Sequence, residues 1–373
     1  MSEEEKLGFR DNNLIRATMS NITPSIEAKI GRALYKNPSH PLCIVKEMVF
    51  QYFNDLTKIE IENPYVPVEY NFDRLRVPAN HPSRRPTDTY YKSETECLRT
   101  HMTCYLYPLG STNKGDSVLK YITCGDVYRK DAIDSSHYPA FHQIDAFCIV
   151  PDDVDVKKDL RNRLKGLVKH LFGKGVEYQF LEDAEYEEVY FPFTVDSLEV
   201  SVTVKDENGK DKQLEVLGAG TVHPDIMKDL GLPNKKAWAF GLGVERLAMV
   251  MFDIPDIRLF WSTDKRFLNQ FSSGKVTKFS PYSKYEACYK DISFYTSPKF
   301  SYNDMCSIAR DEDGGNTIES ITLIDEFQNK GRTSQCYRIT YRSTDTTLKN
   351  SDINKIQKSI RERLEKELEV QVR

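Results

Sequence analysis

The spacing of apolar residues predicts helices and strands over most of the first two thirds of the chain. Apolar residues recur at helical spacing in 41–56, where Pro41 suits the start of a helix, and again in roughly 153–172. Strand patterns occupy about 119–150 and 189–222. These segments predict a domain of the α+β class, in which helices accompany a sheet.

A different pattern begins near residue 280. It consists of a strand near 286–295, a short helix after Ser301, strands near 318–327 and 334–342, a helix from about 352 to 367, and the closing strand "LEVQVR". Ser351 is placed to cap the second helix, whose apolar stripe is Ile353, Ile356, Ile360, Leu364 and Leu368. The order β-α-β-β-α-β predicts a ferredoxin-like domain.

The stretch "VYRKDAIDSSHYPAFHQID" (127–145) reads as a strand, a loop rich in charge and histidine, and a second strand. Alternation in the second strand places Phe141, Gln143, Asp145 and Phe147 on one face, and residues 142, 144, 146, 148 and 150 on the other. An amide and a carboxylate between two aromatics, opposite a strand that ends in Arg129, raise the question of a ligand.

Arginine matches phosphate oxygens with two hydrogen bonds at once. Arg129 ends a strand, and Arg246 follows the glycine turn of "WAFGLGVERLAMVMFDIPDIRLFW" (238–261), which reads as strand, turn and buried helix. If the two arginines converge they clamp a triphosphate, although each taken alone is more often a surface or ion-pair residue. The Gly-x-Gly pairs at 218–220 and 241–243 lack the P-loop and dinucleotide patterns, which disfavours the ordinary nucleotide-binding folds.

Phe191 and Phe193 in "YFPF" are predicted to share one face of a strand, either as core or as the wall of an aromatic pocket. No Ser-His-Asp or Cys-His nucleophile pattern is present, so an enzyme with this sequence works by positioning and electrostatics. The eight scattered cysteines contain no CxxC pair and predict reduced, structural thiols. No apolar run reaches the roughly 20 residues of a membrane span.

We expect four parts along the chain: a lead-in at 1–39, a catalytic domain at 40–262, a linker at 263–279 and the ferredoxin-like domain at 280–373. The net charge of −4 gives no general basic signature, so RNA contact requires a local cluster. The candidates in the last part are Lys330, Arg332, Arg338 and Arg342. A solvated strand face is the plain alternative for each.

These stretches together resemble the single-chain phenylalanyl-tRNA synthetases of mitochondria, which belong to class II. "NITPSIEAKIGRALYKNPSHPL" is similar to the family's first segment and motif 1, and "NFDRLRVPANHPSR" and "DTYY" follow in family order. "GDVYRKDAIDSSHYPAFHQIDAF" resembles motif 2, "FGLGVERLAMVMFDIPDIRLFW" resembles motif 3, and the tail looks like the anticodon-binding domain. The resemblance implies a class II antiparallel-sheet catalytic domain followed by a ferredoxin-like anticodon-binding domain.

Carried over to this sequence, the resemblance implies that the ligands are two substrates, ATP and phenylalanine. The residues implied at ATP are Arg129 on the α-phosphate, Asp131 near the adenine, His137 on the outer phosphates, Phe141 stacked on the base, Arg246 on the γ-phosphate, and Glu245 as the other charged residue of motif 3. The residues implied at phenylalanine are His101, Thr103, Gln143, Asp145, Phe191, Phe193, Gly218, Gly220 and Ala239.

The activity that the resemblance implies is phenylalanine–tRNA ligation: ATP and Mg²⁺ activate phenylalanine, and the acyl group passes to the 2′-OH of the terminal adenosine of tRNA(Phe). No pattern announces the ligands of the metal, so none is named. The resemblance further implies a monomer in the mitochondrial matrix. The opening "MSEEEK" shows neither a secretory signal nor a transit peptide, and the cytoplasm is the alternative location.

The sequence departs from the family pattern in the amino-acid site. In "THMTCYL", Thr103 stands for the usual Ser and Leu106 for the usual Gln; Asp145 replaces a Glu, and "YEA" at 285–287 replaces "YPA". An unmet polar contact in a closed site costs roughly 1–3 kcal/mol. Two alternatives therefore stay open: a relative that charges another aromatic amino acid, and a non-catalytic tRNA-binding protein. The intact set around Arg129 and Arg246 argues against the second.

Overall fold

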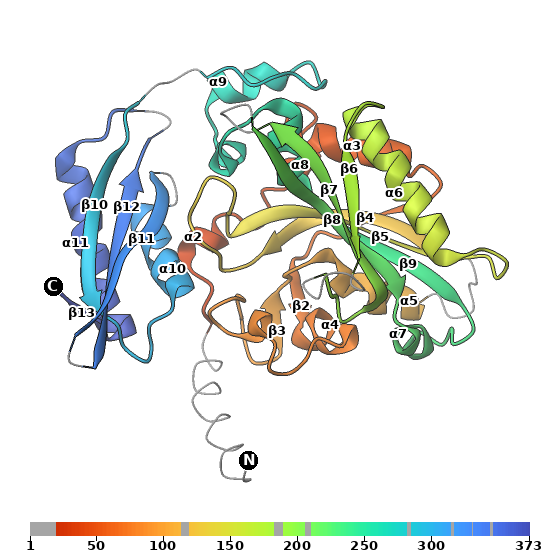
Figure 1. Cartoon of the computed structure of the whole chain (residues 1–373), viewed down its shortest axis with the longest axis horizontal. Coiled ribbons are helices and arrows are strands. Elements are labelled where there is room, and N and C mark those ends of the chain that lie inside the picture. Colours follow the sequence, from red (N-terminus) through yellow and green to blue (C-terminus); the bar gives the residue numbers. More distant parts are fainter. Residues whose placement is uncertain are drawn as a thin grey trace, which may run out of the picture.

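The structure is a computed structural model, and it describes residues 20–112, 119–182, 189–205, 210–281, 285–314, 317–329, 331–343 and 346–373. Lys330, one of the candidates for RNA contact, lies outside the described residues. Figure 1 shows two bodies side by side, a large one around a twisted sheet and a small one at the C-terminal end. The prediction of an α+β catalytic domain and a separate ferredoxin-like domain is confirmed.

The large body is built on seven strands in the order β1-β4-β5-β9-β8-β7-β6. Every neighbouring pair is antiparallel except β1 with β4, which are parallel. The bounds are β1 Thr57–Glu60, β4 Lys120–Tyr128, β5 Ala140–Val150, β6 Tyr178–Glu182, β7 Thr194–Lys205, β8 Asp211–Val222 and β9 Lys236–Gly243, with a small separate pair, β2 Tyr65–Pro67 and β3 Glu96–Leu98.

Three helices cover one face of this sheet: α3 (Pro41–Tyr52), α6 (Val156–Phe172) and α8 (Val244–Phe252). The predicted start at Pro41 is confirmed, and the His40 ring caps it by accepting a hydrogen bond from the Leu42 N–H at 3.2 Å. Apolar side chains from the three helices and from the sheet form the main core. The chemistry is therefore left to the opposite face.

The remaining elements of the large body are short. They are α2 Pro24–Glu27, α4 Val68–Asn71, α5 Leu106–Thr112, α7 Pro224–Asp229, α9 Lys265–Leu268, and the 3-10 turns Leu34–Lys36, Asp73–Leu75, Pro82–Arg84, Met102–Tyr105, Ile257–Trp261 and Asn269–Phe271. A second apolar cluster under α5 and α7 closes the end of the sheet. The segment between residues 98 and 106 reaches the centre of the uncovered face of the sheet.

The small body has the order β10 Cys288–Tyr295, α10 Tyr302–Asp313, β11 Ile318–Asn329, β12 Arg332–Tyr341, α11 Asn350–Leu368 and β13 Gln371–Val372. Its sheet order is β11-β12-β10-β13, so the predicted β-α-β-β-α-β arrangement is confirmed. The predicted cap at Ser351 is wrong: Lys349 is the N-cap, and it makes no side-chain capping bond. Backbone geometry places the helix start two residues earlier than the polar pattern indicated.

The segment predicted as a linker at 263–279 contains α9 and a 3-10 turn. Phe267 and Phe271 are fully buried, and the ring of Phe271 packs edge-to-face on Phe252 of α8. In the lead-in, Ile26 and Tyr35 are likewise buried in the main core. The four-part division of the chain remains a prediction, but residues 20–39 and 265–271 pack on the large body.

The small body contacts the loop that joins β4 to β5. Ile133 of this loop joins the apolar core of the small body. Arg310 of α10 donates a hydrogen bond to the carbonyl of Asp131 at 2.7 Å and another to the carbonyl of Ala132. Lys130 forms an ion pair with Asp304 at 3.1 Å. The tail therefore supports a loop on which two of the predicted ATP residues lie.

All eight cysteines are free, and six of them are buried, which confirms the prediction of structural thiols. Among the described residues, no helix is long and apolar enough to cross a membrane.

Candidate active site

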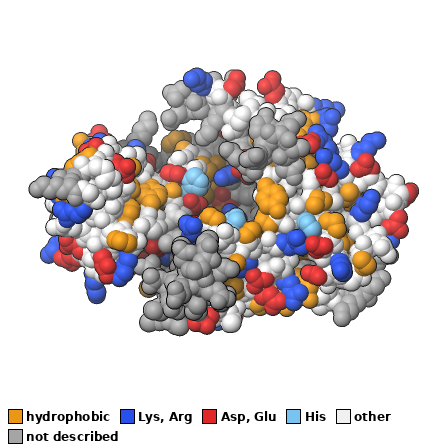
Figure 2. All heavy atoms as spheres, turned by 60° about the horizontal axis from the view of Figure 1, so that its bottom comes forward, with side chains coloured by type: hydrophobic (Ala, Val, Ile, Leu, Met, Phe, Trp, Pro, Cys, Tyr) orange, Lys and Arg blue, Asp and Glu red, His pale blue; other side chains and the backbone are white. Residues whose placement is uncertain are grey.

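A cavity of about 670 Å³ opens on the uncovered face of the large sheet. Figure 2 shows the hollow on one face of the molecule, with charged and histidine side chains around it. Of the fifteen residues that the sequence predicted for the two substrates, fourteen line this cavity; Gly220 does not. The sheet and its loops thus bring together side chains that lie up to 145 positions apart, from His101 to Arg246.

Strand β5 supplies the centre of the cavity by simple alternation. Phe141, Gln143 and Asp145 face the cavity, whereas Ile144 and Ala146 lie in the main core on the other side. This confirms the two faces predicted from the sequence. Gln143 and Asp145, the amide and the carboxylate that lie between Phe141 and Phe147 on this face, therefore line a pocket.

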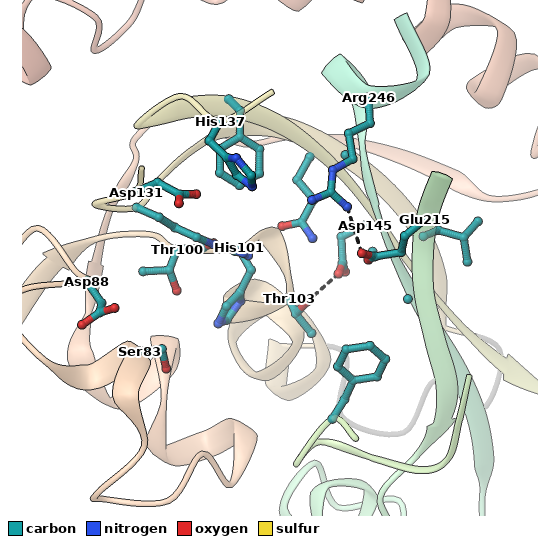
Figure 3. Close-up of a pocket in the computed structure, with 18 of the residues that line it drawn as sticks. Ser83, Asp88, Thr100, His101, Thr103, Asp131, His137, Asp145, Glu215 and Arg246 are labelled. Atoms are coloured by element: carbon teal, nitrogen blue, oxygen red, sulfur yellow. Dashed lines mark hydrogen bonds and ion pairs between the residues drawn. The ribbon is translucent and has the colours of Figure 1, made fainter. Parts of the chain in front are cut away.

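Asp145 lines the cavity and is 1% exposed. Its Oδ2 accepts a hydrogen bond from the Thr103 hydroxyl at 2.7 Å (Figure 3). Burial raises the pKa of the Asp145 carboxyl to about 7, because the charged form loses its hydration and only one hydrogen bond opposes this. A buried carboxylate of this kind is matched to a small cation such as an ammonium group.

Gln143 stands beside Asp145, and the backbone fixes its orientation. Its Oε1 accepts the Met102 N–H at 3.0 Å, which turns the amide nitrogen toward Gly241. A Cβ at position 241 would stand 2.7 Å from that nitrogen, so glycine there makes room for the amide. Leu106, expected to weaken this site, is instead buried behind the wall in a cluster with Phe147 and does not line the cavity.

Aromatic rings form the other side of the pocket. Phe191 and Phe193 stack with centroids 5.8 Å apart and an interplanar angle of 23°. The prediction that they share a strand face is wrong: residues 191–193 form a turn before β7, closed by the Thr194 N–H on the Phe191 carbonyl at 3.0 Å. Pro192 between them has no N–H to donate to a neighbouring strand, which favours a turn over a strand.

The two predicted glycines have different roles. A Cβ on Gly218 would stand 2.5 Å from the Cζ of Phe191, so glycine lets the phenyl ring lie against the backbone of β8. A Cβ on Gly220 would stand 2.7 Å from the Cβ of Thr194, a residue that does not line the cavity. Gly218 belongs to the pocket, whereas Gly220 serves the packing of β8 on β7. Ala239 of β9 lines the pocket with its methyl group.

Two arginines, Arg129 and Arg246, contribute positive charge to the cavity wall. Arg129 donates its Nε–H to the carbonyl of Thr100 at 2.7 Å, and its guanidinium lies 5.2 Å from the centroid of the Phe141 ring. Arg246 pairs with Glu215 of β8 at 2.9 Å (Figure 3). The two arginines come from different elements and line one cavity, as the sequence predicted for a phosphate clamp.

Two of the three histidines that line the cavity, His101 and His137, are in different electrostatic environments. His137 pairs with Asp134 at 2.7 Å, and this hydrogen bond raises the pKa of His137. His101 binds the carbonyl of Asn71 through Nε2 at 3.0 Å, and burial together with the charge of Arg129 lowers its pKa to about 3. His101 is therefore neutral at physiological pH. His137, on the loop, is the one suited to meet an anion.

Glu245 is 2% exposed, and its carboxylate is occupied within the protein. It accepts the His142 N–H at 2.8 Å and contacts Nδ1 of the same residue at 2.6 Å. Sequence analysis missed His142, Glu215 and the exposed Tyr190 at the cavity wall. His142 faces away from the ligand side of β5, and the carboxylate of Glu215 belongs to a strand whose pairing only the fold reveals.

Comparison with known proteins identifies the domain family of each of the two bodies. The model of the tRNA synthetases class II core domain (F) matches residues 25–271, and that of the ferredoxin-fold anticodon binding domain matches 283–373. The large body with its cavity is thus a class II aminoacyl-tRNA synthetase core.

Curated relatives identify the family within this class of synthetases. The phenylalanine–tRNA ligase, chloroplastic/mitochondrial, of Arabidopsis thaliana is 43% identical over 372 residues, which cover 95% of this chain and 83% of that protein. The mitochondrial enzymes of Dictyostelium discoideum and Mus musculus are each 36% identical, over 95% and 92% of this chain and 89% and 83% of theirs. The chain belongs to the family of mitochondrial phenylalanine–tRNA ligases.

Proposed function

We propose that the protein is a phenylalanine–tRNA ligase that activates phenylalanine with ATP and transfers it to tRNA(Phe). The observation that carries the proposal is the lining of the cavity. A buried carboxylate, Asp145, and the stacked rings of Phe191 and Phe193 line the same cavity as two arginines, Arg129 and Arg246. An aromatic amino acid and a triphosphate are complementary to these two sets of side chains.

The amino-acid half acts by orientation. The ammonium group pairs with Asp145 once its carboxyl is ionised, the amide nitrogen of Gln143 is free to bind the carboxylate side, and the phenyl ring lies against Phe191 and Phe193 with Ala239 at its far end. Neutral His101 and Thr103 complete the wall. Holding the reactants in line contributes a large share of such rate enhancements.

The ATP half stabilises charge. The carboxylate of phenylalanine attacks the α-phosphorus, a P–O bond forms, and the bond to pyrophosphate breaks. Arg129 stands at the α-phosphate, Phe141 stacks on the base, and Asp131 and His137 lie on the loop above the nucleotide. Removing one such preorganised charged group costs about 10²–10³ in rate.

Arg246 must exchange its partner when ATP binds. Its side chain and that of Glu215 are 40% and 46% exposed, and an ion pair at this exposure is worth at most about 1 kcal/mol. The outer phosphates of ATP therefore displace Glu215 easily. The exchange leaves the carboxylate of Glu215 beside the phosphates, where a cation is favourable.

Magnesium fits this arrangement as a companion of ATP. Within the described part of the chain no group of three His, Cys, Asp or Glu side chains could hold a metal ion by itself. Mg²⁺ commonly binds through one or two carboxylates plus substrate phosphates and keeps several waters. Glu215 fits the carboxylate of such a site, and the bound ion would neutralise charge on the outer phosphates.

The open face of the small sheet supports a tRNA partner. Arg338 lies 4.1 Å from the ring centroid of Tyr289, which is 60% exposed, and Arg332 lies 4.0 Å from that of Tyr295. Four-stranded sheets of this kind stack bases on exposed aromatics and arginine planes. Arg342, the other described candidate, pairs with Glu319 at 2.9 Å, and Arg338 itself pairs with Asp291 at 2.9 Å while it packs on Tyr289. We assign anticodon contact to Tyr289, Tyr295, Arg332 and Arg338.

The protein acts as a monomer, and the names of its relatives support the mitochondrial matrix as its location, with the cytoplasm as the alternative. The experiment that tests the ligase activity uses tRNA(Phe) transcripts ending in 2′-deoxyadenosine or 3′-deoxyadenosine. Charging of the 3′-deoxy form with phenylalanine, and not of the 2′-deoxy form, is the expected result. Charging of neither, beside normal binding, would contradict the proposal.

A further inference from the structure

His142 and Glu245 form a buried contact between the two elements that hold ATP in the proposed function. His142 stands on β5 directly after Phe141, and Glu245 stands in the first turn of α8 directly before Arg246. Their exposed fractions are 0% and 2%. The Glu245 carboxylate takes two hydrogen bonds from His142, one from its N–H at 2.8 Å and one at Nδ1 at 2.6 Å.

The backbone explains why this contact is needed. The ladder between β5 and β9 ends at the pair Gln143–Gly243, because β9 turns into α8 at Val244. Within the described residues, β9 has no strand position opposite His142 whose carbonyl could accept its N–H, and a buried N–H without a partner is costly. Glu245 supplies the acceptor with its side chain, and its negative charge is favourable at the start of a helix.

The imidazole ring completes the contact from the core side. A carboxylate only accepts hydrogen bonds, so the Nδ1 atom carries the proton that points to Glu245. The ring packs against Tyr35 and Trp261, with centroids 5.5 and 5.8 Å away. Its buried Nε2 has no hydrogen-bond partner within the described chain. The ring therefore does not contact substrate, and it provides packing and one directed donor.

We propose that His142 is a positioning residue that sets the separation between Phe141 and Arg246. These residues hold the base and the outer phosphates, so the contact fixes the length of the ATP site. Gln143, on the other side of His142, is held independently by the ladder to Gly243 and by the Met102 N–H. Loss of the contact therefore weakens ATP binding and spares phenylalanine. The inference rests on the proposed function only in naming ATP as the ligand.

Two substitutions separate the donor from the ring. His142→Asn keeps an N–H close to the position of Nδ1 but loses the ring, and His142→Phe keeps a ring but loses the donor. His40→Phe is the matched control, because His40 is a buried histidine of the same core with a 2.9 Å contact to the Phe260 carbonyl and none to the cavity. Steady-state KM values for ATP and phenylalanine, ATP affinity by calorimetry, and Tm are measured for each.

We expect KM for ATP to rise when the Nδ1–H donor is lost, and Tm to fall when the packing of the ring is lost. His142→Phe raises KM for ATP about tenfold or more and leaves KM for phenylalanine within about twofold. His142→Asn recovers most of the ATP affinity at a lower Tm, and His40→Phe lowers Tm alone. Equal losses of ATP affinity in both His142 variants, in proportion to Tm, would overturn the proposal.

The two proposals fail in different ways. If the wild-type protein activates no phenylalanine, the proposed function fails. Calorimetric ATP affinity still tests the contact then, because that measurement needs no amino acid. ATP affinity that is unchanged in His142→Phe overturns the positioning role even in a fully active ligase.

Discussion

The hydroxyl of Thr103 donates a 2.7 Å hydrogen bond to the buried carboxylate of Asp145, and both residues line the cavity. Both stand at positions where the sequence departs from its family pattern. The two positions contact each other directly, so we expect substitutions at them to act together. We therefore predict that the proposed amino-acid site is a working variant rather than a damaged one.

The raised pKa of Asp145 predicts a pH-dependent affinity for phenylalanine. Only the ionised carboxylate pairs with the ammonium group, so KM for phenylalanine rises about tenfold for each unit by which the pH falls below 7. The measurement is KM for phenylalanine between pH 5.5 and 8. Asp145→Asn is the control: it binds phenylalanine weakly at every pH. A flat profile for the wild-type enzyme would refute the assignment of the ammonium to Asp145.

The same shift has the opposite effect on the stability of the ligand-free protein. The pKa of this carboxyl is raised from its ordinary 3.8 to about 7, so its stabilising contribution is full below pH 4. It is lost as the pH rises through 7. Denaturant titrations of the wild type and Asp145→Asn across this range measure the difference, which grows in favour of Asn as the pH rises. No growth of the difference would contradict it.

Ala239→Gly is expected to widen the far end of the ring pocket. Its methyl group lines the cavity, and its removal leaves space for a para substituent, so para-chlorophenylalanine is activated by the variant. Ala237→Gly is the matched control, since Ala237 is a buried alanine of the same strand that does not line the cavity. If the analogue stays excluded from the Ala239 variant, this residue does not limit the ring site.

Gly218→Ala and Gly220→Ala separate ligand binding from packing. The new Cβ at 218 overlaps the Phe191 ring, so the ring must shift and KM for phenylalanine rises about tenfold or more. The new Cβ at 220 meets Thr194, so that variant loses stability, by about 1–3 kcal/mol, with little change in KM. Equal effects of the two substitutions on KM would show that Gly218 has no special place in the pocket.

Arg129→Ala and Arg246→Ala are expected to lower the rate of adenylate formation by about 10²–10³ each without unfolding the protein. Arg246→Lys recovers little, because a lysine cannot make the two parallel hydrogen bonds of a guanidinium to phosphate. Single-turnover adenylate formation measures the effect, and circular dichroism checks the fold. Near-normal rates in either alanine variant would contradict the phosphate clamp.

Tyr289→Ala tests the assigned RNA face of the tail. The ring is 60% exposed and pairs with Arg338, so its loss raises KM for tRNA and leaves adenylate formation unchanged. Leu323→Ala is the control, because Leu323 is exposed on the same sheet but its register with Tyr337 places it on the other face. A point substitution is cleaner than deletion of the tail, which would uncover Ile133.

Local patterns predicted much of this structure. Alternation along β5 gave the two faces around Gln143 correctly, and element order alone gave the ferredoxin-like arrangement. The turn at Phe191 was misjudged, since alternation of aromatics around Pro192 resembles a strand when the lost N–H is ignored. The family pattern placed position 106 at the substrate, whereas the Leu106 side chain packs in a neighbouring apolar cluster with Phe147.

Features that depend on long-range pairing could not be predicted. Glu245 has the residue type of an ATP ligand, and only the end of the β5–β9 ladder reveals that its carboxylate belongs to His142. Glu215 meets Arg246 because β8 and β9 are neighbours, a pairing that no spacing in the sequence encodes.

The measurement that tests the central claim most directly is ATP–pyrophosphate exchange with Mg²⁺, without tRNA, across the twenty amino acids. Phenylalanine alone is expected to support exchange, which would show that Thr103 and Asp145 form a working ammonium site. Exchange with a different amino acid, or with none while the protein is folded and binds tRNA, would contradict the proposed function.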